Sequence, residues 1–211
     1  MQLSLRSMEK NNKVSVMGES VKAKKRKVAW GITGGGDKIA EILDVMKDLK
    51  RQSEEVVEIQ VFLSKAADIV LKYYKLEDDL KQNFQKVQLE INSNSPFLAA
   101  WLQMRKYEFL LIAPASSNTV AKIANGIGDT LLTNAAIMSL KAFVPVYVLP
   151  TDYRESIVYT KLPNGKEMKL RVRKEEADQV RKLESMEDMH VLESPQKMRE
   201  AFLEWLKTIK A

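Results

Sequence analysis

Apolar residues follow two patterns between residues 28 and 150 of the chain. Short apolar runs at 28–32, 56–63, 87–91, 109–113 and 144–149 predict strands, and the run at 109–113 is typical of a strand buried on both faces. Between the runs, apolar residues recur three and four positions apart, as at Ile39, Ile42 and Met46. This spacing predicts amphipathic helices over 39–49, 66–74 with an extension through 76–84, 116–125 and 129–140.

A further helix is predicted between the third and fourth runs. Ser95 has the character of a helix cap and Pro96 that of a first helical residue, with Trp101 and Leu102 on one face. Strands and helices thus alternate throughout. This order predicts an α/β fold with a doubly wound parallel sheet, Rossmann-like or flavodoxin-like, and helices on both faces.

The pattern changes after Pro150. Segments 158–162 and 168–172 flank Pro-Asn-Gly at 163–165, which predicts a β-hairpin arm. A charged helix over 174–186, a short strand at 191–192 and a last helix from Pro195 follow. We therefore expect a basic N-terminal extension at 1–26, a ligand-binding α/β domain at 27–150, and an arm with C-terminal helices at 151–211. The last part is expected to pack on the same domain or on a neighbouring subunit.

Composition narrows the possible chemistry. The 211 residues include no Cys and one His, His190. These counts exclude disulfides, cysteine nucleophiles, zinc–thiolate sites and multi-histidine metal sites, so no metal site is predicted. The net charge of +6 equals the surplus of residues 1–27, which hold eight basic and two acidic residues. A basic tail attracts polyanions weakly, so no nucleic-acid-binding domain is predicted.

No apolar stretch approaches the roughly 20 residues of a membrane helix, and the N-terminus lacks the apolar core of a signal peptide. We expect a cytoplasmic protein with no membrane segment.

Ligands of open parallel sheets bind beyond the carboxyl ends of the strands, so the loops after the strands carry the candidate site. The first loop reads Gly-Ile-Thr-Gly-Gly-Gly-Asp at 31–37. Its backbone can approach an anion closely, and Thr33 adds a hydroxyl. It lacks the Gly-Lys-Ser/Thr of a P-loop and the full dinucleotide fingerprint. A plain tight turn explains the same glycines, and both interpretations stay open.

The loop after the fourth strand is more informative. It reads Pro-Ala-Ser-Ser-Asn-Thr at 114–119 and opens a helix. Ser116 or Ser117 can cap that helix, but a cap explains one polar residue of the four. The remaining hydroxyl and amide groups suit hydrogen bonding to a phosphate, a ribityl chain or a heterocycle.

These motifs, together with Ala-Lys-Ile-Ala-Asn-Gly-Ile-Gly-Asp-Thr-Leu-Leu-Thr-Asn-Ala at 121–135, resemble the superfamily of homo-oligomeric flavin-containing cysteine decarboxylases, which also includes the flavin prenyltransferases. The resemblance covers residues 27–150. The segment from Pro150 to Arg181 is closer to the archaeal branch, with the archaeoflavoproteins and the FMN-containing dihydromethanopterin reductases.

The resemblance implies a bound FMN. The cofactor-binding candidates, transferred by position, are Thr33, Gly34, Gly35, Ser64, Pro114, Ala115, Ser116, Ser117, Asn118, Thr119 and Asn134. It also implies a homo-oligomer, a trimer or a multiple of trimers, with the FMN near the subunit interface.

Departures from the family favour redox chemistry. The decarboxylases carry a catalytic His shortly before the central strand, and residues 99–103 hold none. Their Pro-x-Met-Asn motif is replaced by Pro-Thr-Asp-Tyr at 150–153. Asn134 stands where prenyltransferases usually have Arg. We expect an FMN-dependent oxidoreductase or electron carrier that accepts electrons from ferredoxin or reduces a pterin. The alternatives are a flavin-dependent decarboxylase or flavin prenyltransferase, and a non-catalytic nucleotide-binding subunit.

Two groups of residues have competing interpretations. The basic residues of the arm suit docking of an acidic, ferredoxin-type electron carrier, whereas packing against a neighbouring subunit explains them as well. Tyr73, Tyr74 and Trp101 suit stacking on a flavin ring, but helix packing is the favoured interpretation.

Overall fold

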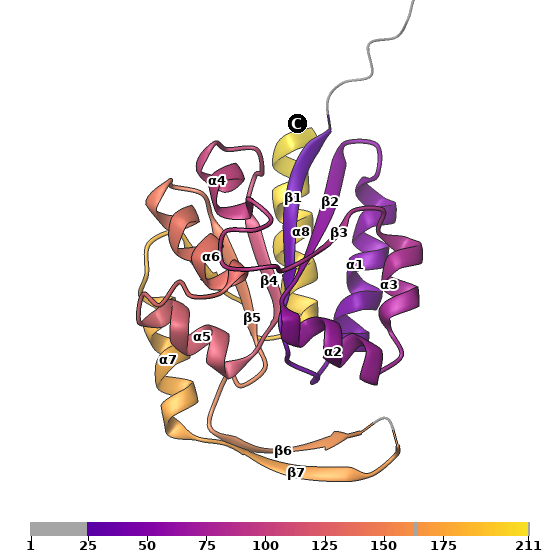
Figure 1. The fold of residues 1–211 in the computed structure, drawn as a ribbon, viewed down its shortest axis with the longest axis vertical. Helices are drawn as coiled ribbons and strands as arrows, with labels where there is room; N and C mark the ends of the chain where they lie inside the picture. Colours follow the sequence, from indigo (N-terminus) through magenta and orange to yellow (C-terminus); the bar gives the residue numbers. More distant parts are fainter. Residues whose placement is uncertain (1–24, 163, 211) are drawn as a thin grey trace, which may run out of the picture.

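The computed structural model describes residues 25–162 and 164–210, and the predicted basic extension lies outside these residues except for Lys25 and Arg26. Six strands form a parallel sheet in the order β3-β2-β1-β4-β5-β8 (Figure 1). They are β1 (Arg26–Ile32), β2 (Val57–Leu63), β3 (Val87–Leu89), β4 (Leu110–Ala115), β5 (Val146–Pro150) and β8 (Met189–Val191). The predicted parallel α/β fold is confirmed, and of the two doubly wound orders this is the Rossmann one.

Helices cover both faces of the sheet (Figure 1). One face carries α1 (Ile39–Ser53), α2 (Lys65–Tyr73), α3 (Glu77–Asn83) and α8 (Pro195–Lys210). The other carries α4 (Leu98–Gln103), α5 (Ser117–Ala124), α6 (Leu131–Lys141) and α7 (Lys174–Glu184). Each face has its own core, because the sheet residues alternate between the two layers, as Val28 and Ala29 do. No helix within the described ranges is long and apolar enough to cross a membrane.

The strand order reverses between β1 and β4, which pair in parallel. Trp30, which is buried, donates from its indole N–H to the Ala113 carbonyl at 2.8 Å and fixes the two strands together. The pairing of β4 with β5 is irregular between Ile112 and Ala115. At a reversal point of this kind the flanking loops diverge and leave a crevice at the carboxyl edge.

The predicted hairpin is confirmed as a separate antiparallel sheet of β6 (Ser156–Lys161) and β7 (Glu167–Val172). It projects beyond the carboxyl edge of the main sheet and runs below α2 and α5 in Figure 1. We call residues 156–172 the arm. Cross-strand pairing places Val158 beside Leu170 and Tyr159 beside Lys169. Because paired residues share a face, the arm has one face with Val158 and Leu170 and an opposite face with Tyr159 and Lys169.

Two local predictions were wrong. The helix at 66–74 does not extend through 84, because Lys75 adopts a left-handed conformation with φ of 56° that separates α2 from α3. Ser95 does not cap α4, since the helix begins at Leu98 and Phe97 takes the cap position without a side-chain bond. Ser95 instead forms a β-bridge with Asn92, so the loop after β3 is a compact turn.

Candidate functional site

Backbone hydrogen bonds link the loops that leave the carboxyl edge of the sheet. Glu90 N donates to Leu63 O at 2.8 Å, and Ser64 N donates to Ile32 O at 3.0 Å. Across the reversal point, Thr33 N donates to Pro114 O at 3.2 Å. The loops after β1, β2, β3 and β4 therefore form one continuous rim.

Thr33 is the main tie between the first and fourth loops. Its hydroxyl donates to Pro114 O at 2.8 Å and accepts from Ser116 N at 2.7 Å, and the side chain is buried. Pro114 and Ala115 are buried too, and Ala115 O accepts from Thr151 N at 2.9 Å. The polar groups of these three candidates are thus used inside the chain, where they hold the loops in place.

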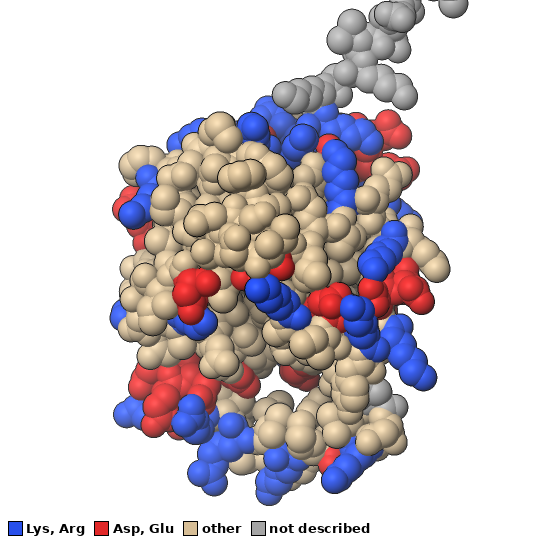
Figure 2. Space-filling view, in the orientation of Figure 1, with Lys and Arg blue, Asp and Glu red and all other residues tan. Residues whose placement is uncertain are grey.

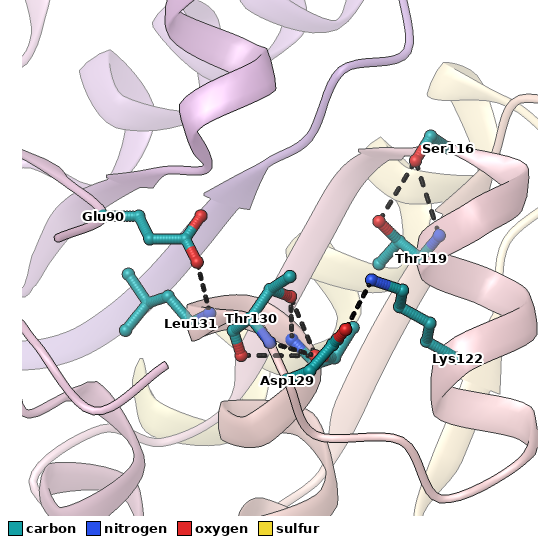
Figure 3. A network of polar contacts seen from close by, with 8 residues as sticks. Glu90, Ser116, Thr119, Lys122, Asp129, Thr130 and Leu131 are labelled. Carbon is teal, nitrogen blue, oxygen red and sulfur yellow. Dashed lines mark hydrogen bonds and ion pairs between the residues drawn. The ribbon is translucent and has the colours of Figure 1, made fainter. Parts of the chain in front are cut away.

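The predicted cap of α5 is present and is Ser116. Its hydroxyl accepts from Thr119 N at 3.4 Å and lies 3.1 Å from the Thr119 hydroxyl (Figure 3). The N–H groups of Ser117 and Asn118 make no hydrogen bond among the described residues, which leaves two donors at this helix start. Asn118 is exposed. The loop therefore offers free backbone donors beside hydroxyl and amide side chains, a suitable donor set for a phosphate.

Ser64 and Asn134 lie at the starts of two other helices of the rim. Ser64 caps α2 by accepting from Ala67 N at 3.1 Å. The Asn134 side-chain amide donates to Ser93 O at 2.9 Å and to Asn94 Oδ1 at 3.0 Å. Both candidates therefore already hold local structure.

Glu90 is an element of this rim that sequence analysis missed. Its carboxylate accepts from Leu131 N at 2.9 Å (Figure 3) and from Lys65 N at 3.2 Å, and it thereby joins the starts of α6 and α2. The side chain is only 8% exposed. A carboxylate already balances these two helix starts, whereas the first N–H groups of α5 remain free. A polar residue directly after a strand at the ligand edge is the signal that would have found it.

The glycine loop approaches two neighbouring segments closely. A Cβ added to Gly35 would lie 2.5 Å from Thr151 Cγ2, and one added to Gly36 would lie 2.9 Å from the Tyr74 ring. Any other residue would push the loop away from these side chains. Gly34 likewise packs on Ala66. Close packing against neighbouring segments therefore accounts for these glycines, and a role of the loop in binding an anion stays a prediction.

A cleft of about 190 Å³ opens between this loop and the arm, and Figure 2 shows the hollow between them. The body side contributes Asp37, Tyr74, Thr151 and Asp152, and the arm side Val158, Thr160, Met168 and Leu170. The Asp152 carboxylate accepts through Oδ2 from the Ser117 hydroxyl and from the Thr151 hydroxyl. The cleft thus adjoins the start of α5 through the contact between Ser117 and Asp152.

Asp152 was not among the sequence candidates, and Tyr74 was considered there only as a ring that could stack on a flavin. Burial raises the pKa of Tyr74, with a smaller contribution from nearby Asp37, so its phenol is protonated at neutral pH. Tyr74 packs edge-on against Tyr73, and Trp101 packs near Phe62, as the helix-packing interpretation predicts. The Tyr74 ring also lines the cleft.

His190 lies in another part of the molecule. It is stacked on Tyr147, with ring centroids 4.6 Å apart, and lines a separate cavity with Glu204 and Trp205. None of the predicted site residues lines that cavity. Within the described ranges, no group of three or more His, Cys, Asp or Glu side chains is arranged to hold a metal ion.

The chain matches the sequence model of the family described as Flavoprotein over residues 17–202. An uncharacterized protein of Methanocaldococcus jannaschii is 42% identical over 184 residues, which cover 87% of this chain and 98% of that protein. A dihydromethanopterin reductase (acceptor) of the same organism is 31% identical, over 83% of this chain and 95% of that protein.

Among solved structures, DmrB of Burkholderia xenovorans in complex with FMN, described as a cubic protein cage for redox transfer, superposes with a TM-score of 0.75. It is 33% identical over 90% of this chain and 99% of that chain.

Proposed function

The chain belongs to the flavoprotein family, and from this premise we propose that it binds FMN at the carboxyl edge of the sheet and acts as an oxidoreductase that reduces a dihydropterin. The similarity to a dihydromethanopterin reductase and to a protein crystallised with FMN supports the proposal. The observation that carries it is the free helix start of α5, which adjoins the cleft under the arm.

The residues present suit a phosphorylated, hydroxylated cofactor. The N–H groups of Ser117 and Asn118 would bind the phosphate, assisted by the side chains of Asn118 and Thr119. Ser64 and Asn134 lie on the same rim, where their oxygen atoms can accept from ribityl hydroxyls. Thr33, Gly34, Gly35, Pro114, Ala115 and Ser116 form the backbone that holds these groups in position.

When bound, FMN supplies hydride or single-electron transfer. The protein positions the reactants and limits access of water. Val158 and Leu170 form an apolar wall on the arm side of the cleft, while the Tyr74 phenol presents an O–H group on the body side. Redox chemistry of this kind needs no Cys or His in the site, in agreement with the composition.

We propose that the arm also receives the electron carrier. Its outward face carries the exposed basic residues Lys169 and Arg171, Lys166 is exposed just before β7, and Figure 2 shows basic side chains along the outer edge of the arm. Tyr159 lies beneath Lys169, with the ammonium 5.8 Å from the ring centroid. An exposed aromatic beside basic side chains suits an acidic partner of the ferredoxin type.

We further propose a homo-oligomer built from trimers. Leu89, Ile91 and Phe97, all exposed, lie within one segment at the β3 edge of the sheet, next to the loop that contacts Asn134. Exposed apolar residues gathered beside a binding site are typical of a subunit interface. Light scattering coupled to size-exclusion chromatography tests this proposal, and a monomer at micromolar concentration contradicts it.

The proposed activity is tested under anaerobic conditions. The purified protein is saturated with FMN and reduced with ferredoxin or with NAD(P)H, and dihydropterin is then added. We expect reoxidation of the flavin coupled to formation of tetrahydropterin. A flavin that is reduced but never reoxidised by the pterin contradicts the proposed substrate, and a flavin that no donor reduces supports the non-catalytic alternative.

A further inference from the structure

We propose that Asp152 is the residue that selects the substrate ring, by accepting hydrogen bonds from adjacent N–H groups on its edge. The proposal rests on the proposed function, because it concerns the ring that reacts at the same site. The supporting features are the two unlike walls of the cleft, its size, its charge and the way Asp152 is held.

The walls of the cleft suit a flat heterocycle. Val158 and Leu170, with Thr160 and Met168, belong to the face of the arm that is turned toward the body. Opposite them lie Asp152 and the phenol of Tyr74. A planar ring with one polar edge satisfies both walls, since its faces contact the apolar side chains while its edge meets the polar groups.

The size of the cleft limits what it accepts. Its volume of about 190 Å³ is below the roughly 300–1,000 Å³ of pockets that enclose whole drug-sized ligands. It therefore accommodates one ring system, while the remainder of a larger substrate extends into solvent.

The charge of the cleft disfavours an anionic group inside it. The residues that line it include two carboxylates, those of Asp37 and Asp152, and no Lys or Arg. A prenyl diphosphate in this cleft would meet like charge without compensation, which disfavours prenyl transfer here. The same carboxylates favour a ring with N–H donors, because they accept hydrogen bonds from such donors strongly.

Asp152 is held for recognition. Its Oδ2 accepts from the hydroxyls of Ser117 and Thr151, so the carboxylate has a fixed orientation. A carboxylate has about four acceptor sites, of which these bonds use two. Among the described residues nothing donates to Oδ1. The remaining capacity matches two N–H donors, the number that the 2-amino-4-oxo edge of a pterin presents side by side.

The test compares two rings that differ in one group. Pterin carries an amino group beside its ring N–H, and lumazine carries a carbonyl in the same place. Their affinities for the FMN-loaded protein are measured by isothermal titration calorimetry, and the FMN content of every sample is determined separately. The variants are Asp152→Asn and, as a matched control, Asp78→Asn, which removes an exposed carboxylate from the first turn of α3.

We expect the unaltered protein to bind pterin about 10- to 100-fold more tightly than lumazine, the factor for one lost charge-assisted hydrogen bond. Asp152→Asn should lose this preference, and Asp78→Asn should keep it. Leu170→Ala should weaken the binding of both rings by a similar factor, because an apolar side chain makes no hydrogen bond to the ring edge.

Equal affinity of the unaltered protein for both rings overturns the inference, whether or not Asp152→Asn folds. An unchanged preference in a folded, FMN-loaded Asp152→Asn protein does the same and leaves the proposed FMN binding intact. A chain that takes up no FMN overturns the proposed function and this inference with it.

Discussion

The Glu90 bridge provides the sharpest test of how the rim is built. Replacing Glu90 with Gln keeps the size of the side chain but leaves one oxygen for two backbone donors. Lys65 N and Leu131 N both point at the carboxylate, at 3.2 and 2.9 Å. The introduced NH₂ group therefore faces one of these N–H groups donor to donor.

The magnitude follows from the bond that is lost. A hydrogen bond to a charged group contributes about 1.5–3 kcal/mol, and a carboxylate at a helix start about 0.3–1 kcal/mol more. Glu90→Gln should therefore lower the free energy of unfolding by about 2–3 kcal/mol. With a urea m-value of about 2–3 kcal/mol/M, the midpoint shifts down by roughly 1 M.

The assay is urea unfolding of the FMN-free protein followed by tryptophan fluorescence. FMN is removed first because a ligand that binds the folded state adds its own stabilisation and would hide part of the change. The matched control is Glu55→Gln at an exposed position, expected within about 0.5 kcal/mol of the unaltered protein. If Glu90→Gln also stays within that limit, the carboxylate does not hold the two helices together.

Four further substitutions give three more tests. Ser116→Ala and Ser194→Ala each remove a helix cap and should each cost about 1 kcal/mol of stability. Only Ser116→Ala should also weaken FMN binding in a fluorescence titration. An equal loss of FMN affinity in both variants argues against a site at α5. Tyr107 donates to Gln60 at 2.6 Å, and burial raises its pKa far above the usual value. The stability that depends on the neutral phenol is complete below pH about 10 and is lost at higher pH. Tyr107→Phe should therefore be less stable than the unaltered protein at pH 7, but its stability in thermal unfolding should decline less steeply at alkaline pH. Parallel pH–stability curves of the two proteins contradict this. Lys75→Gly should raise the free energy of unfolding in urea by up to about 1 kcal/mol, because glycine relieves the left-handed strain at this position. A decrease in stability would show that Lys75 is not strained.

The fold was predictable because the sequence patterns that mark its strands and helices are local and periodic. Apolar runs marked the strands and the three-and-four spacing marked the helices, and tertiary packing agreed with both. The two errors arose where the backbone conformation, and not the spacing of apolar residues, determined the local structure. The spacing around Lys75 gave no sign of a left-handed residue, and Ser95 has the composition of a cap but forms a bridge with Asn92.

The local structure of the candidate site was predictable where polar residues follow a strand directly in sequence. The cap at Ser116 was found in this way, and the binding role of the polar residues after it stays a prediction. Glu90 and Asp152 were missed because their roles depend on partners distant in sequence, with Leu131 lying 41 residues from Glu90 and Ser117 lying 35 residues from Asp152. The internal use of the Thr33 hydroxyl by Pro114 was hidden for the same reason.

The central claim is that the carboxyl edge of this sheet binds FMN, and titration of the FMN-free protein with FMN tests it most directly. We expect equimolar, saturable binding with the flavin spectrum of a bound chromophore, weakened by Ser116→Ala and unaffected by Ser194→Ala. A protein that stays colourless in excess FMN, or whose binding is indifferent to Ser116, contradicts the account.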